Sequence, residues 1–146
     1  MIKRYSTEEM SNIWSDYNRF KTWERVEITV AEVMSDYGII PKKSIQTIKK
    51  KTKFDVERIL EIEKITRHDV IAFLTNMAEC IGPDSRFVHM GMTSSDLLDT
   101  SLALQCKVAG EIILNKLFEF NEVLEQNAKK YKETFQIGRS HGIHAE

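Results

Sequence analysis

The chain has 146 residues, enough for one domain or slightly more, and 42% of them are hydrophobic and 29% charged. This composition supplies a folded core and argues against a disordered chain. The net charge of −1 argues against a nucleic-acid-binding protein, for which a basic excess is typical. No apolar run reaches the roughly 20 residues of a membrane span, and the first residues lack a signal peptide's apolar stretch. We therefore expect a cytoplasmic protein that binds neither nucleic acid nor membrane, with both cysteines reduced in the core.

The first part of the chain has the spacing of helices and no sustained alternation typical of strands. Ser6 and Glu9 predict a capping box that opens a short helix ending at Trp14. Ser15 predicts the cap of a second helix, which ends before Gly38. Its apolar residues recur at steps of three and four and are Phe20, Trp23, Val26, Val30, Val33 and Tyr37.

Residues 42–53 are rich in lysine. Such a run is either a phosphate or nucleic-acid patch or the solvated face of a short helix or loop. The absence of interleaved aromatic residues favours the solvated face. Two further helices are expected, one over about 55–65 and one from about 67 to the Gly82–Pro83 pair.

The longest predicted helix runs from Asp96 to about Lys132. Its apolar residues follow an eleven-residue repeat, which corresponds to about 3.67 residues per turn. A helix of this length extends about 55 Å, well beyond the radius of gyration of about 15 Å expected for a compact chain of this size. The apolar stripe therefore needs partners, either from other subunits or from downstream residues. The stripe consists of Leu98, Leu102, Cys106, Ala109, Ile113, Leu117, Phe120, Leu124, Ala128 and Tyr131.

Four polar segments interrupt the helical pattern and contain all four histidines. Histidine exchanges a proton near neutral pH without large tuning of its pKa. The hydroxyls and backbone amides at the start of the long helix suit a carboxylate or phosphate. Gly138 and Gly142 bracket His141, which allows the chain to turn sharply. The four segments are residues 3–5, 66–69, 87–96 and 138–144.

Each segment also has a purely structural interpretation. Arg67 and Asp69 could form an ion pair at a helix start, and the run from Thr93 could serve only to cap the long helix. His141 and His144 lack the helical context and the cysteine spacing of a zinc site, so no metal is expected.

Taken together and in order, these segments resemble adenylosuccinate lyase, within the fumarase and aspartase superfamily. The resemblance spans nearly the whole chain. Thr93–Asp96 and Gly138–Gly142 suit the wider superfamily, whereas Arg4–Tyr5 and Arg67–Asp69 favour adenylosuccinate lyase. The similar stretches are residues 3–5, 13–20, 61–70, 88–96 and 138–146.

The resemblance implies an all-α chain, with an N-terminal helical domain over residues 1–93. Residues 94–146 would then begin a central domain built as a bundle of long helices. It also implies a homotetramer whose active sites are shared between subunits, without a cofactor. The implied reaction is β-elimination of fumarate, from adenylosuccinate to give AMP and from the succinyl-carboxamide ribotide of the same purine pathway.

The resemblance also implies roles for individual residues. His141 is similar to the general acid that protonates the leaving nitrogen, and His68 to its supporting partner. Arg4 and Tyr5 are similar to residues that hold the nucleotide phosphate. Proton donation near neutral pH and several polar contacts suit a nitrogen leaving group and a dianion. The remaining implied substrate contacts are Arg67, Asp69, His89 near the nucleotide, Thr93 and Ser94 at the succinyl carboxylates, and Ser140, where many relatives carry threonine.

Members of this family are much longer, and their presumed general-base serine lies in a glycine-rich loop further along the chain. We therefore expect an N-terminal fragment that is inactive alone. Two alternatives stay open. One is another superfamily lyase, such as argininosuccinate lyase, class II fumarase, aspartase or the muconate-cycloisomerising branch. The other is a non-catalytic helical interaction module that binds through its apolar stripe.

Overall fold

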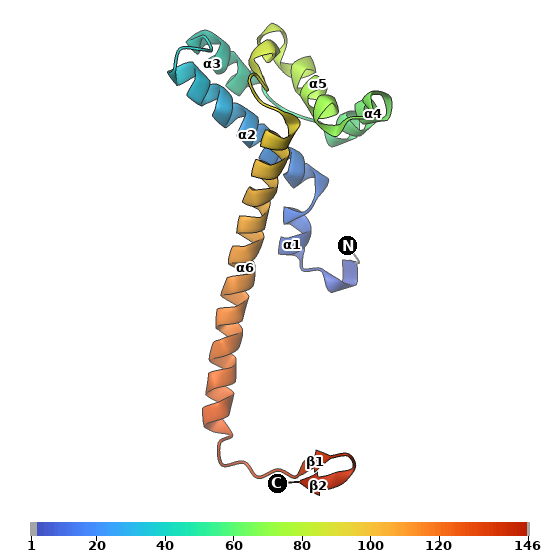
Figure 1. Cartoon of the computed structure of the whole chain (residues 1–146), viewed down its shortest axis with the longest axis vertical. Helices are drawn as coiled ribbons and strands as arrows, with labels where there is room; N and C mark the ends of the chain where they lie inside the picture. The colour runs from blue at the N-terminus through green and yellow to red at the C-terminus, as the bar shows by residue number, and fades with distance from the viewer. Residues whose placement is uncertain (1–2, 146) are drawn as a thin grey trace. The chain divides into compact units, whose positions relative to one another are not determined.

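The computed structural model describes residues 3–145, most of which are helical (Figure 1). This confirms the all-α expectation. The chain divides into two compact units, one through Ala109 and one from Gly110, and the domain division expected between residues 93 and 94 stays a prediction. The elements are the 3-10 helix η1 (Lys3–Tyr5), α1 (Glu8–Ile13), α2 (Asp16–Asp36), α3 (Lys42–Lys51), α4 (Val56–Thr66), α5 (Asp69–Ile81), the 3-10 helix η2 (Pro83–Phe87), α6 (Ser94–Lys130), β1 (Gly138–Ser140) and β2 (Ile143–Ala145).

The first two helices begin at hydroxyl caps. The Ser15 hydroxyl accepts a hydrogen bond from the Asn18 amide at 3.2 Å, as predicted for α2. The cap of α1 is Thr7 rather than Ser6, because Thr7 is the residue with extended backbone at the helix start and accepts from the Met10 amide. Gly38 follows the end of α2 with φ +76°, a left-handed conformation that glycine adopts without a steric penalty.

The predicted apolar face of α2 is buried at its start and exposed at its end. Phe20 and Trp23 are buried, whereas Tyr37 is 80% exposed. At 100° per residue, Tyr37 lies about 100° around the helix from Phe20. Ala31 lies about 20° from Phe20 by the same geometry and is buried instead. The residues at steps of three and four therefore follow the packed face at the start of α2 and lie off it in the last turns.

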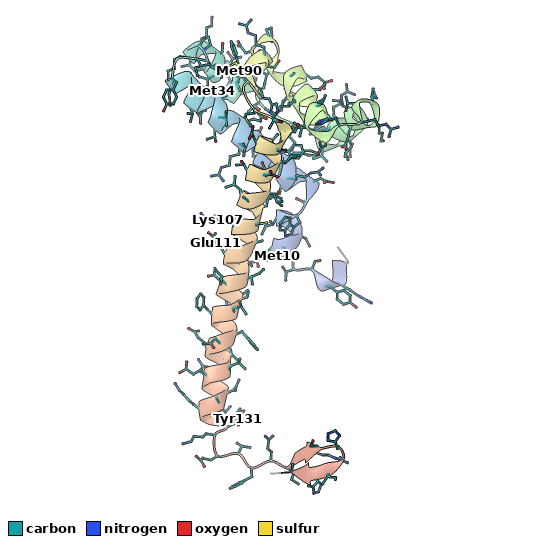
Figure 2. All side chains as sticks on the ribbon, in the orientation of Figure 1. Met10, Met34, Met90, Lys107, Glu111 and Tyr131 are labelled. Carbon is teal, nitrogen blue, oxygen red and sulfur yellow. The ribbon has the colours of Figure 1, made fainter. Side chains whose placement is uncertain are left out.

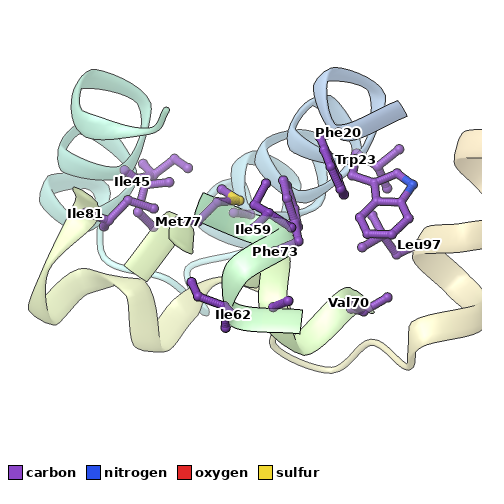
Figure 3. Close-up of a cluster of buried hydrophobic side chains, with 14 of the residues drawn as sticks. Phe20, Trp23, Ile45, Ile59, Ile62, Val70, Phe73, Met77, Ile81 and Leu97 are labelled. Atoms are coloured by element: carbon purple, nitrogen blue, oxygen red, sulfur yellow. The ribbon is translucent and has the colours of Figure 1, made fainter. Parts of the chain in front are cut away.

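The core of the first unit is one cluster to which α2, α3, α4, α5 and the start of α6 contribute (Figure 3). Its centre is aromatic: the Phe73 ring stacks on Phe20 at a centroid distance of 5.8 Å and meets Trp23 edge-on at 5.4 Å. Leu97 of α6 is fully buried in the same cluster. The long helix is thus anchored by its first turn.

The lysines of α3 are exposed, while Ser44, Ile45 and Ile48 of the same helix face the core. The first lysine, Lys42, pairs with Asp36 at 2.6 Å. This agrees with the solvated-face interpretation of residues 42–53.

The helices α4 and α5 form an antiparallel pair. Asp55 caps α4 by accepting from the Arg58 amide at 2.9 Å, and Arg58 forms two hydrogen bonds to Glu79 of α5, at 2.7 and 3.2 Å. The second helix begins at Asp69, two residues later than expected, because Arg67 turns the chain with φ +54°.

The long helix α6 has 37 residues and starts and ends within two residues of the prediction. The face packed on the first unit is Leu97, Ser101, Gln105 and Ala109, four residues apart. The Gln105 side chain donates to the carbonyl of Ile13 at 2.7 Å, which ties α1 to α6.

The predicted stripe of α6 differs from this packed face and shares only Ala109 with it. Leu102 and Cys106 are exposed, so the expectation of a core position was wrong for Cys106. Farther along, Ile113, Leu117 and Phe120 are each more than half exposed, and side chains project all around α6 between Glu111 and Tyr131 (Figure 2). From Ile113 onward the described chain leaves the stripe without a cover, as expected, whereas Leu98 packs against the core cluster and Ala109 is buried. In residues 3–145 no helix is both long and apolar enough to cross a membrane.

The second unit ends in a small hairpin that the sequence did not predict. Strands β1 and β2 pair antiparallel, with Ser140 opposite Ile143. The two turn residues, His141 and Gly142, both have positive φ (50° and 78°), as a type I′ turn requires. Three-residue strands are too short for an alternation signal, although the sharp turn at Gly142 was expected.

Candidate functional site

The segment Arg67–His68–Asp69 joins α4 to α5. His68 is the N-cap of α5, and its Nδ1 accepts a long hydrogen bond of 3.4 Å from the Ile71 amide. Asp69 Oδ1 also lies 3.5 Å from Nδ1, but one nitrogen cannot accept from the amide and donate to the carboxylate in the same state. The amide always carries its hydrogen, so we assign the lone pair to Nδ1 and the proton of the neutral ring to Nε2. The carboxylate of Asp69 instead accepts a hydrogen bond from the Val70 amide at 2.7 Å, and no described ion pair joins it to Arg67.

This segment is at the surface yet firmly anchored. The His68 side chain is 42% exposed and that of Asp69 38% exposed, whereas the next residue, Val70, is buried in the core cluster. The polar groups are therefore accessible to a ligand while the backbone beneath them is fixed.

Thr93 and Ser94 lie at the start of α6. The Thr93 amide donates to the Asp96 carboxylate at 2.8 Å, and the Asp96 amide donates to the Thr93 carbonyl at 3.0 Å. This reciprocal pair is a helix cap, so the capping interpretation holds for the Thr93 backbone. Like the segment before α5, this one is anchored in the core cluster, here by Leu97.

His89 lies in the loop before α6 and pairs with Glu27 of α2, a residue that sequence analysis missed. Glu27 Oε1 is 2.6 Å from His89 Nδ1, and Oε2 accepts from the His89 amide at 2.9 Å. Glu27 is only 1% exposed. Burial raises the pKa of this carboxyl, and the hydrogen bond and charge of His89 offset part of the rise. Its position in the sequence could have revealed Glu27, because it follows Trp23 by four residues and therefore lies on the same buried face of α2.

Arg4 and Tyr5 form the 3-10 helix η1, with both side chains exposed. The Arg4 guanidinium lies over the Tyr5 ring, 4.7 Å from its centroid. The two residues therefore present a cation and a phenol together.

Ser140 and His141 lie on the hairpin of the second unit and are exposed. His144, on the opposite strand, pairs in register with Arg139. Within residues 3–145, no group of three or more His, Cys, Asp or Glu side chains is arranged to hold a metal ion.

Backbone conformation sets three of the candidate residues apart. In the described part of the chain, the non-glycine residues with positive φ are Arg67, His89 and His141. Each belongs to a different polar segment, and strained backbone of this kind concentrates at functional sites. Eight of the ten candidates lie in the first unit, where no described hydrogen bond or ion pair joins the 66–69 segment to Thr93 or Ser94.

Comparison with known proteins defines the class. Residues 3–146 match the model of a protein family described as "Lyase", and the chain therefore belongs to this lyase family. A solved structure, the 3-carboxy-cis,cis-muconate lactonizing enzyme from Pseudomonas putida, aligns with 97% of the chain and 34% of its own length, with a TM-score of 0.87 and 25% identity.

The most similar curated relatives include adenylosuccinate lyases. The enzyme of Bacillus subtilis (strain 168) is 46% identical to the chain and that of Staphylococcus saprophyticus 49% identical, both over all 146 residues. The chain spans 34% of the length of each relative. These identities confirm the resemblance to adenylosuccinate lyase.

Proposed function

We propose that the chain is the N-terminal part of an adenylosuccinate lyase, which eliminates fumarate from adenylosuccinate and from the succinyl-carboxamide ribotide of purine synthesis. The observation that carries this proposal is the identity of 46–49% over all 146 residues with enzymes of that name. Because the chain spans about a third of their length, the activity belongs to the longer protein. Residues 1–146 alone are expected to be inactive.

The proposed chemistry breaks the bond between the nitrogen of the nucleotide and the succinyl group. A base outside these residues removes a proton from the carbon next to a carboxylate, and His141 protonates the departing nitrogen. His68 supports this proton transfer. Its position supports that role, because the cap contact of Nδ1 leaves the proton of the neutral ring on Nε2.

The proposed contacts divide the substrate among the polar segments. Arg4 and Tyr5 bind the phosphate, and His89 lies near the nucleotide. Thr93 and Ser94 bind the succinyl carboxylates through their hydroxyls. The remaining proposed contacts are Arg67, Asp69 and Ser140.

The exposed stripe of α6 supports a homotetramer with active sites shared between subunits. Leu117, Phe120 and Leu124 are each at least half exposed, and apolar surface of this kind is covered in a stable assembly. A cytoplasmic location suits an enzyme that acts on nucleotides.

The test is proton NMR on the gene product that carries this chain, with adenylosuccinate, argininosuccinate, malate and aspartate in one tube. Selective loss of adenylosuccinate with matching growth of fumarate supports the proposal. Loss of another substrate replaces the purine assignment with a different superfamily lyase. No change in a folded protein favours the helical interaction module. The isolated 146-residue chain is the matched control, and fumarate release from it would contradict its expected inactivity.

A further inference from the structure

Glu27 is a charged residue at a fully buried position of α2, where an apolar residue would be more usual. It lies on the face of α2 that carries Trp23 and Val26 into the core. An ion pair at such a position is often no more stable than well-packed apolar residues, so burial of the charge calls for another explanation.

Both oxygens of Glu27 are committed to a single residue. Oε2 holds the His89 amide at 2.9 Å and Oε1 holds the ring at Nδ1 at 2.6 Å. This two-point contact fixes the His89 backbone and ring together. The backbone needs such a contact, because His89 has φ +62°, a backbone angle that residues other than glycine rarely adopt.

The loop around His89 is packed as well. Met90 and Met92 pack against the core cluster, and a Cβ placed on Gly91 would come within 3.2 Å of Met34 Cε. Core side chains therefore hold the loop, and Glu27 adds the polar contact that orients the His89 ring.

The contact also determines which ring nitrogen meets a ligand. Nδ1 donates to the carboxylate, so Nε2 is left for other partners. When the ring is protonated, Nε2 becomes a donor and Glu27 balances the positive charge. An imidazolium held in this way suits an anionic group.

We propose that Glu27 is a positioning residue of the lyase site, which holds His89 so that Nε2 binds an anionic group of the substrate, either its phosphate or a succinyl carboxylate. The inference rests on the proposed function, because only that reaction supplies such a substrate. Glu27 itself touches no substrate and acts through His89.

The decisive variant is Glu27→Gln in the gene product that carries this chain. The side-chain amide keeps the shape and one acceptor for the His89 backbone, but it presents a donor to Nδ1. The neutral ring must then move its proton to Nε2, and the balancing negative charge is lost. We expect KM for adenylosuccinate to rise about tenfold or more, with a smaller change in kcat and a melting temperature within a few degrees of wild type.

A double-mutant cycle separates positioning from simple structural support. His89→Gln alone is expected to raise KM to a similar degree, and adding Glu27→Gln to it is expected to raise KM no further. The control is Glu24→Gln, which neutralises a second buried carboxylate of α2 that pairs with Lys21 instead. We expect it to leave KM within twofold of wild type.

Product inhibition distinguishes the two anionic groups. If Nε2 binds the phosphate, Glu27→Gln weakens inhibition by AMP and leaves inhibition by fumarate unchanged. If it binds a carboxylate, the reverse holds. Glu27→Asp provides a second test, because it keeps the charge but moves the carboxylate away from His89 by the length of one methylene. We expect an intermediate rise in KM.

Unchanged KM in both Glu27 variants, or an equal effect of Glu27→Gln with and without His89, overturns the positioning role. If the wild-type protein does not consume adenylosuccinate, the proposed function fails first and this inference fails with it. The wild-type measurement therefore tells the two failures apart.

Discussion

At the scale of single residues, three of the polar segments contain a residue in an energetically unfavourable backbone conformation. A left-handed backbone costs about 1–2 kcal/mol at a residue that carries a side chain, and Arg67, His89 and His141 all adopt it. Glycine would serve the backbone better at each position. The proposed binding roles give these side chains a reason to occupy such positions.

Arg67→Gly tests this trade-off. Because Arg67 follows α4 with φ +54°, we expect glycine to raise the free energy of unfolding by about 0.5–1 kcal/mol. We expect the same change to lower lyase activity in the longer protein, since it removes a proposed substrate contact. Urea unfolding and a fumarate assay measure the two effects, with Arg67→Lys as the control for charge. A variant that is both less stable and fully active would contradict this prediction.

Glu27 predicts a pH dependence of stability. Its folded-state pKa is raised by burial above the ordinary value of 4.5, so its proton is held more tightly in the folded than in the unfolded protein. Its contribution to stability is therefore present below about pH 4.5 and is lost as the pH rises through the folded-state pKa. We expect urea unfolding to show that the stability of wild type relative to Glu27→Gln falls as the pH rises above about 4.5. Glu27→Ala should cost about 2 kcal/mol, because it leaves the His89 amide without its partner.

The two proposed proton-transfer residues predict a large loss of activity without loss of structure. In the longer protein, His141→Gln is expected to lower kcat about 10²–10⁴-fold, and His68→Gln to lower it by a similar or smaller factor. His144→Gln is the matched control, because His144 is an exposed histidine of the same hairpin. Equal effects at His141 and His144 would argue against the acid role.

At the scale of elements, α5 is central to the first unit. It places Phe73 against Phe20 and Trp23, and His68 is the N-cap of the same helix, so this helix carries both a core residue and a candidate site residue. The caps of α2 and α4 were predictable because each depends on a side chain and an amide three residues apart. The hairpin was not predictable, because strands of three residues are too short to show an alternation of polar and apolar residues.

Phe73→Ala is expected to lower the free energy of unfolding by about 3–5 kcal/mol, because it leaves a cavity among fully buried aromatic rings. Ile71→Ala, on the exposed side of the same helix, should cost less than about 1 kcal/mol. Chemical denaturation of the chain compares the two. Similar losses from both variants would show that the α5 face has been assigned wrongly.

At the scale of the whole molecule, the chain is two units joined by one continuous helix. The first unit has its own aromatic core. The second contains the C-terminal half of α6, whose large apolar side chains are exposed, followed by a small hairpin. Eight of the ten candidate residues belong to the first unit, and Ser140 and His141 belong to the second.

The exposed stripe predicts self-association of the chain. Leu117→Gln with Leu124→Gln removes two exposed apolar side chains seven residues apart on one face of α6. We expect sedimentation velocity to show an associated wild-type chain and a shift toward monomer in the double variant. Glu122→Gln, an exposed polar site on α6, is the control. A wild-type chain that is monomeric at all concentrations would remove the support that the stripe lends to a tetramer.

The sequence by itself determined the helices, the long α6 and the identity of the polar segments, because caps and helical periods depend on neighbours within about four residues. Only the tertiary structure decided that Tyr37 and Cys106 are exposed and that Glu27 meets His89. The last contact joins residues 62 positions apart. Such pairings depend on how distant elements pack against one another, which no local pattern specifies.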